Sequence, residues 1–170
     1  MKNFIDKIML ELFSSLGDCE YKENLINPEE IDYKKLCKES RIGSAKIGYF
    51  TLNPESMNLK FENINPILLS KKEWIGKQHG EVFAEVIALY GNTHCIPGVE
   101  YQKFLQENPD KIPKELRLNE LNLYYTPASI IGNLNKNWFT FGGVFSHLTW
   151  HVGIFSVEND WQENEYVIIL

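Results

Sequence analysis

Residues 137–157 read NWFTFGGVFSHLTWHVGIFSV and contain no aspartate, glutamate, lysine or arginine. A stretch this apolar has to be buried, and its mixture of glycine, threonine, valine and aromatic residues favours strands over helix. The wider C-terminal segment has the same character, since residues 121–170 hold ten of the 22 aromatic residues and only five charged ones. We therefore expect residues 119–170 to form an antiparallel sheet or a small barrel of about five strands.

Candidate strands divide this C-terminal part into Leu121–Thr126, Ser129–Gly132, Trp138–Phe145, His147–Val157 and Tyr166–Leu170. The polar residues 133–137 are typical of a hairpin loop. The Gly142-Gly143 pair inside a strand pattern predicts a bulge or a sharp bend. A membrane span is a poor alternative, because the histidines and hydroxyl groups of this stretch would need partners in hydrocarbon and no cluster of Lys or Arg flanks it.

Helix signals concentrate in residues 1–118. Helical spacing of apolar residues or well-placed capping residues predict helices over residues 4–16, 27–39, 83–90 and 99–107. Ser70 and Glu73 form a capping box, but Gly76 and Gly80 should divide the helix that follows. The alternation in residues 42–69 predicts a short β meander. We expect one α+β domain over residues 1–170, with a helical N-terminal two-thirds and then the antiparallel sheet or barrel.

The composition disfavours several classes of function. A net charge of −6 opposes direct binding to nucleic acid or to an anionic membrane, because both require a positive field. The cysteines at positions 19, 37 and 95 are an odd number and favour reduced thiols over a disulfide framework. Asp6 and Glu11 interrupt the N-terminal apolar run, which disfavours a signal peptide. We expect a cytoplasmic protein with an acidic surface.

One candidate for catalysis is a cysteine nucleophile. Cys95 lies in the sequence NTHCIPG at residues 92–98, between two predicted helices. A thiol of this kind needs a neighbouring imidazole to become a thiolate near neutral pH. His147 or His151 could be that base, and Asp160 or Asn159 could orient the ring. The alternative is a structural thiol packed near a helix end.

A metal site is a weaker candidate. His147 and His151 share one strand face, but a four-residue step along a regular strand separates their Cα atoms by about 13 Å. One ion therefore cannot bind both while the strand stays regular. We expect neither a metal nor another cofactor. The sequence also contains no phosphate-binding glycine loop, nucleophile elbow or Cys-x-x-Cys pair.

Two features favour protein binding instead. The carboxylates at 158, 160, 163 and 165 are typical of a solvated loop or of a rim that steers a basic partner. Trp138, Trp150 and Trp161 would make a hot-spot patch if they emerge on one side of the sheet, because indoles usually keep their N–H near water.

The leading hypothesis is a non-enzymatic protein-interaction module that binds a protein partner or itself. The alternatives are a small cysteine-dependent hydrolase or transferase using Cys95, and an acidic inhibitor of a nucleic-acid-binding enzyme.

Overall fold

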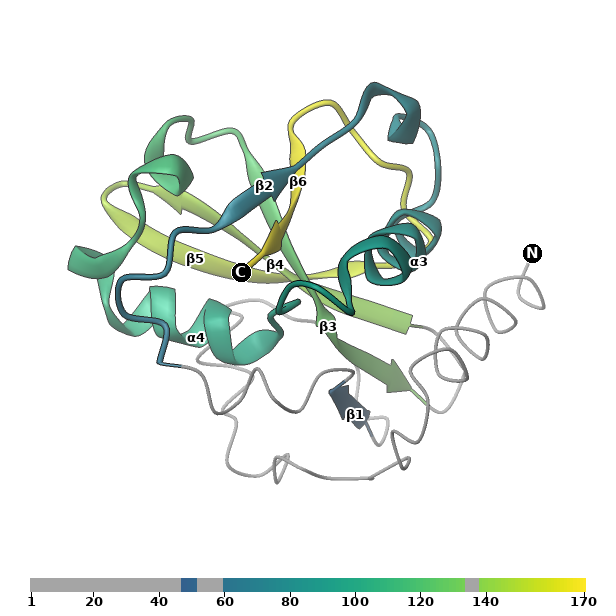
Figure 1. Ribbon diagram of the computed structural model, residues 1–170, viewed down its shortest axis with the longest axis horizontal. Helices are drawn as coiled ribbons and strands as arrows, with labels where there is room; N and C mark the ends of the chain where they lie inside the picture. The colour runs from purple at the N-terminus through teal and green to yellow at the C-terminus, as the bar shows by residue number, and fades with distance from the viewer. Residues whose placement is uncertain (1–46, 52–59, 134–137) are drawn as a thin grey trace.

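The computed structural model describes residues 47–51, 60–133 and 138–170 (Figure 1). The α-helices are α3 (His79–Tyr90) and α4 (Val99–Glu107), and the 3-10 helices are η2 (Lys72–Trp74), η3 (Pro109–Lys111) and η4 (Lys114–Arg117). The strands are β1 (Ile47–Thr51), β2 (Ile67–Leu69), β3 (Leu123–Asn133), β4 (Trp138–Ser146), β5 (Thr149–Ser156) and β6 (Glu165–Ile169). The helices predicted over residues 4–16 and 27–39 lie outside the described residues.

All six strands belong to one sheet. Five of them follow the order β2-β6-β3-β4-β5, and β1 lies beside β3. Strand β3 is long enough to change partners along its length: residues 123–125 pair with β6, and residues 129–133 pair with β1. Its register against β4 shifts between Tyr125 and Ile130, at the point where the partner changes.

The expected architecture is wrong in two respects. The N-terminal two-thirds was expected to be mostly helical, but the described part of residues 1–118 has two α-helices, three short 3-10 helices and two strands. The sheet is mixed and open rather than antiparallel or closed, because β6 runs parallel to β3. Such a parallel pair needs a long crossover, here the β4–β5 hairpin and the loop over residues 157–164, and no local pattern reveals which strands it will join.

The predicted meander is also wrong, although two of its strands exist. Strand β1 pairs with β3, and β2 pairs with β6, so the two short strands add to the main sheet instead of pairing with each other. Helix α4 occupies the predicted residues 99–107. Helix α3 begins at His79, where Gln78 and Glu81 form the capping box, while Ser70 and Glu73 precede only the short turn η2.

The bulge or bend expected at Gly142-Gly143 lies on the β3 side of β4, where the register shifts beside Gly142, between Tyr125 and Ile130; the pairing of β4 with β5 has no such shift. Both residues keep a regular register, opposite Gly153 and Val152. Their lack of a side chain makes room for aromatic rings: a Cβ at Gly142 would come 3.0 Å from the Phe155 ring. A Cβ at Gly143 would collide with the Trp150 ring and with the Gln102 side chain.

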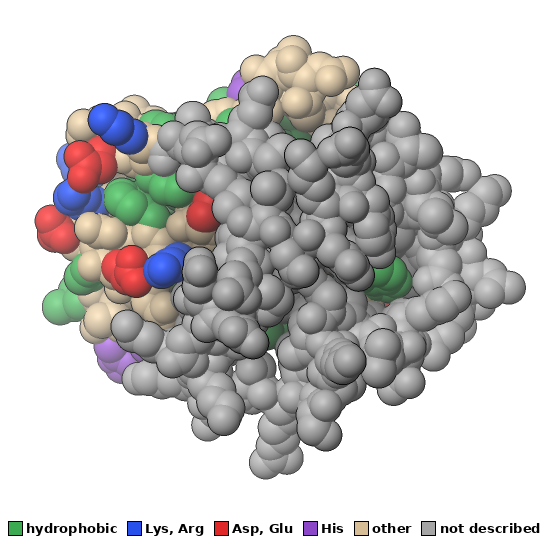
Figure 2. All heavy atoms as spheres, turned by 90° about the horizontal axis from the view of Figure 1, so that it is seen from below, with side chains coloured by type: hydrophobic (Ala, Val, Ile, Leu, Met, Phe, Trp, Pro, Cys, Tyr) green, Lys and Arg blue, Asp and Glu red, His purple; other side chains and the backbone are tan. Residues whose placement is uncertain are grey.

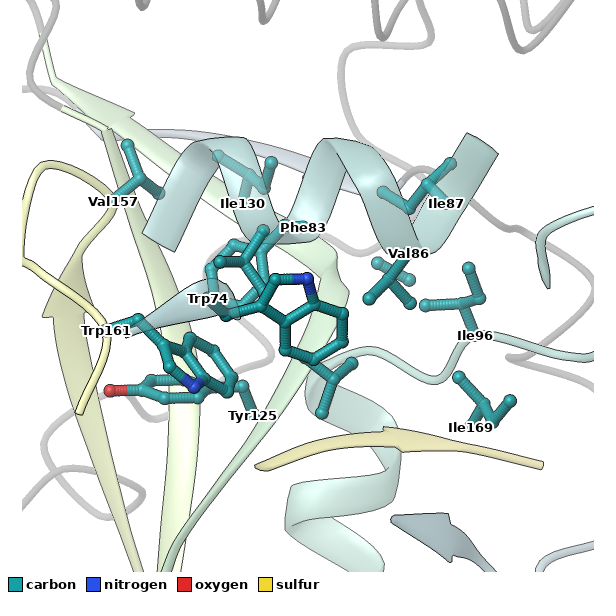
Figure 3. Close-up of a cluster of buried hydrophobic side chains, with 13 residues drawn as sticks. Trp74, Phe83, Val86, Ile87, Ile96, Tyr125, Ile130, Val157, Trp161 and Ile169 are labelled. Carbon is teal, nitrogen blue, oxygen red and sulfur yellow. The ribbon is translucent and has the colours of Figure 1, made fainter. Parts of the chain in front are cut away.

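The two faces of the sheet carry separate hydrophobic clusters. One lies under α3 and is shown in Figure 3, where the Trp74, Trp161 and Tyr125 rings gather beneath the helix. The other lies under α4 and includes Tyr124 of β3. Because successive residues of a strand point to opposite faces, the neighbours Tyr124 and Tyr125 anchor the two clusters from one strand.

The N-terminal end of α3 is attached to the segment that follows β5. His79 N–H donates to the Asn159 carbonyl at 2.8 Å, and Gly80 N–H donates to the Val157 carbonyl at 2.9 Å. These bonds satisfy main-chain donors that a helix leaves unpaired at its start. In the described ranges no helix combines the length and the apolar character needed to cross a membrane.

Candidate functional site

Cys95 lies in a segment that bridges β6 and β3. Its N–H donates to the Leu170 carbonyl at 2.9 Å, and the Leu170 N–H donates to the Cys95 carbonyl at 2.8 Å. Two residues later, the Pro97 carbonyl accepts from the Ala128 N–H at 3.2 Å. Cys95 is partly exposed, and its backbone is hydrogen-bonded to Leu170, the residue that follows β6.

The histidines proposed as its base lie elsewhere. His147 is in the β4–β5 turn and His151 is on β5, both exposed. Strands β3 and β4 separate β5 from β6, to which Cys95 is bonded. The His151 Nε2 atom lies 3.2 Å from the Ser146 carbonyl oxygen, within its own hairpin. The described contacts therefore do not bring Cys95 together with either histidine.

Asp160 and Asn159, the residues proposed to orient the histidine ring, line a pocket that does not include Cys95. Asp160 is exposed and pairs through its backbone with Gln78. The Asn159 carbonyl is used by the start of α3.

The three tryptophans do not share an exposed face. Trp150 and Trp161 are only 2% and 0% exposed, and Trp138 is half-buried against the cluster under α3. The Trp150 N–H finds its partner inside the protein, donating to Gln102 Oε1 at 2.7 Å. Trp150 and Trp161 therefore lack the exposure that motivated a tryptophan patch, and Trp150 can be buried because Gly143 leaves room for its ring.

A buried polar cluster that the sequence analysis missed lies on the side of the sheet that α3 covers. It joins α3, β3 and β6. Glu165 of β6 is the acceptor at its centre. His79 Nε2 lies 2.8 Å from Glu165 Oε2, the Tyr125 hydroxyl donates to Glu165 Oε1 at 2.7 Å, and the Gln162 N–H donates to Glu165 Oε2 at 2.7 Å. His79, Tyr125 and Glu165 are at most 6% exposed.

The environment of Glu165 favours the carboxylate. Burial alone would raise its pKa, but the His79 ring, the Gln162 N–H and the Tyr125 hydroxyl together lower the pKa of Glu165 below its ordinary value. Burial, reinforced by the neighbouring Glu165, raises the pKa of Tyr125, so that hydroxyl keeps its proton and remains a donor. The cluster is therefore a carboxylate held by three donors.

Both nitrogens of His79 are used within the protein. Nδ1 lies 3.3 Å from the Ser156 carbonyl oxygen and Nε2 faces Glu165. Because both of these partners are hydrogen-bond acceptors, neither nitrogen is left to exchange a proton with a bound molecule without breaking an internal contact. This geometry fits a structural cluster better than an acid–base centre.

An open pocket of about 520 Å³ lies over this cluster. Its lining includes apolar walls from Leu123 and Phe155 and carboxylates from Glu158, Asp160 and Glu165, without a lysine or an arginine. Glu158 and Asp160 are exposed, whereas Glu165 is already bonded. The pocket therefore has an acidic rim, and the carboxylate at its floor is already hydrogen-bonded to other groups of the protein.

The Glu165 cluster predicts a loss of stability in acid. Because the pKa of Glu165 in the folded chain is lowered from 4.5, its contribution is complete above that unfolded value and is lost as pH falls through the lower folded value. Urea unfolding followed from about pH 7 to about pH 3 should show a steeper loss in the wild type than in Glu165→Gln. Glu85, whose pKa Lys71 lowers to about 2, affects both proteins equally. Parallel profiles would contradict this account.

A second feature stands out at the β4–β5 turn. His147 and Leu148 both have positive φ angles, 49° and 63°, although neither is a glycine. A two-residue hairpin of this kind normally uses Asn-Gly, because both central residues need positive φ angles, which glycine and asparagine tolerate best. Leu148 is also 81% exposed. At the tip of the hairpin Leu148 therefore combines an unfavourable backbone conformation with an apolar side chain exposed to water.

Two further leucines lie at the same end of the sheet. Leu118 and Leu121 are 79% and 76% exposed, and they follow η4 and precede β3. The Arg117 guanidinium lies 5.9 Å from the Phe145 ring centre, which places η4 beside the last residues of β4. Figure 1 shows the turn and this segment together on the left. We call Leu118, Leu121, His147 and Leu148 the hairpin end.

The described surface near this region is mixed in character. Figure 2 shows hydrophobic side chains interspersed with charged side chains of both signs over the part of that face that the structure describes. Over the described ranges, no three His, Cys, Asp or Glu side chains are grouped so as to hold a metal ion. Comparisons of the chain with protein-family models, with curated proteins and with solved structures found no match.

Proposed function

We propose that this protein is a non-enzymatic protein-interaction module in the cytoplasm that docks through its hairpin end. The observation that carries the proposal is Leu148, a large apolar residue that is 81% exposed at φ 63°. The odd cysteine count supports the compartment. The use of both His79 nitrogens inside the protein supports a role without catalysis.

Leu148 is costly to the isolated protein in two ways, through its backbone conformation and through its exposure to water, and this cost favours a role in binding. An L-residue in the left-handed region costs about 1–2 kcal/mol relative to its right-handed conformation. Exposing a leucine that could be buried forgoes about another 1.5–3 kcal/mol. Strain of this kind persists where the surrounding structure enforces it, and it is concentrated at functional sites. Contact with another chain would bury the leucine and recover the second term.

Leu148→Asn tests this proposal because it should change fold stability and binding in opposite directions. Asparagine tolerates positive φ, so the free energy of unfolding should rise by about 0.5–1 kcal/mol. Loss of a buried anchor should weaken any complex at least about tenfold. Urea unfolding measures the first effect. Native mass spectrometry and affinity capture, with the amount of complex quantified for both proteins, measure the second.

Leu89→Gln is the matched control, since Leu89 is 57% exposed on the regular helix α3. A complex that the wild type and this control retain, and that Leu148→Asn loses, supports the proposal. Equal complex formation by all three proteins would overturn the assignment of the hairpin end. A marked drop in stability of Leu148→Asn would show that the turn conformation serves the fold instead.

A further inference from the structure

Strand β5 is an edge of the described sheet. It pairs with β4 on one side, and no described strand pairs with its other side over residues 149–155. Beyond that stretch the edge is occupied: the His79 ring meets the Ser156 carbonyl, and the Gly80 N–H donates to the Val157 carbonyl at 2.9 Å. The opposite edge strand, β2, has only three residues.

The open stretch lacks the devices that normally protect an edge strand. Proteins discourage edge pairing with short strands, prolines, bulges or charged residues, especially lysine. Strand β5 has eight residues, reads TWHVGIFS and carries no proline, lysine or carboxylate. Its pairing with β4 is regular over its whole length. It is therefore well suited to receive another strand.

We propose that β5 pairs antiparallel with β5 of a second copy of this chain. This inference rests on the proposed function and names the partner that the hairpin end would meet. The midpoint of the open stretch is Val152, and pairing about that residue brings Thr149 opposite Phe155 of the second copy. The same register brings Leu148 level with Ser156 of the second copy, next to the segment that lines the acidic pocket.

Charge favours a second copy at this place. The chain carries a net charge of −6, so most surfaces of two copies repel one another, but residues 137–157 have no charged side chains to bring together. Because the pairing is antiparallel and symmetric about Val152, each copy makes the same contacts with the other. Two equivalent contacts of this kind, related by a two-fold axis, close the assembly as a dimer.

His151→Lys tests the edge directly. His151 is exposed on β5, and its contact with the Ser146 carbonyl can be replaced by a lysine ammonium, so the fold should tolerate the change. A lysine on an edge strand opposes pairing, because a second strand placed beside it would remove water from the charged ammonium group. Sedimentation of the full-length protein over a range of concentrations should show a wild-type dimer whose dissociation constant rises at least about tenfold in His151→Lys. Leu89→Lys, with the same charge on α3, should leave the dimer unchanged.

Hydrogen exchange locates the interface. The amides of residues 149–155 should become more protected as the wild-type concentration rises through the dissociation constant, and those of His151→Lys should not. A strictly monomeric wild type overturns the inference, and so does a dimer whose 149–155 amides are insensitive to concentration. If the monomer still captures a different protein through Leu148, the proposed function stands and only its self-pairing is overturned. If neither association occurs, both are overturned.

Discussion

Replacing Glu165 by alanine is expected to lower the free energy of unfolding by about 3–5 kcal/mol, because it removes one partner of a buried charged cluster. Three donors, from His79, Tyr125 and Gln162, lose their shared acceptor at once. They come from α3, β3 and the loop before β6, so the damage extends across one face of the sheet. Urea unfolding and thermal denaturation would measure the loss, which corresponds to a fall in Tm on the order of 10 °C.

Two variants separate this explanation from a general sensitivity to lost acidic residues. Glu158→Ala removes an exposed carboxylate from the rim of the same pocket and should change stability by no more than about 0.5 kcal/mol. Glu165→Gln preserves the side-chain volume and one oxygen acceptor, so it should lie between the wild type and Glu165→Ala. If Glu165→Ala costs less than about 1 kcal/mol, the three donors find solvent or other partners, and the cluster does not organise this face.

Local sequence patterns located the strands better than their partners. The uncharged residues 137–157 predicted two strands joined near Ser146, and β4 and β5 meet at that point. Alternation cannot show that β6 crosses back to run beside β3 in parallel, since this pairing depends on which buried faces fit together in three dimensions. The same limit explains why β1 and β2 were expected to pair with each other.

The candidate sites were less predictable than the strands because they depend on contacts distant in sequence. His79 and Glu165 are separated by 86 positions, and each residue alone resembles an ordinary surface residue of a helix or loop. The tryptophans misled for a related reason: Gly143 and Gln102 provide Trp150 with space and a hydrogen-bond acceptor from other elements. The one available signal was at the hairpin tip, where the residues His147-Leu148 stand in place of the usual Asn-Gly.

Gly143→Ala should be more disruptive than a methyl added at Gly142 or Gly153, lowering the free energy of unfolding by about 2–4 kcal/mol through overpacking and a weakened hydrogen bond. The new Cβ would collide with the Trp150 ring and the Gln102 side chain, which are hydrogen-bonded to each other at 2.7 Å. Both neighbours are buried, so neither can swing into solvent. Urea unfolding measures the loss, and near-ultraviolet circular dichroism should report a changed Trp150 environment.

Gly80→Ala is the matched control, because a Cβ there meets only ordinary contacts, the nearest at 3.5 Å from the Val157 carbonyl oxygen. Its position in the first turn of α3 should make it neutral or stabilising by up to about 1 kcal/mol. Combining Gly143→Ala with Trp150→Phe should cost less than the sum of the two changes, since the smaller ring relieves the collision. Additive losses would show that the Trp150 ring is not what excludes a side chain at residue 143, and the reason for that glycine would then have to lie in the backbone of β4.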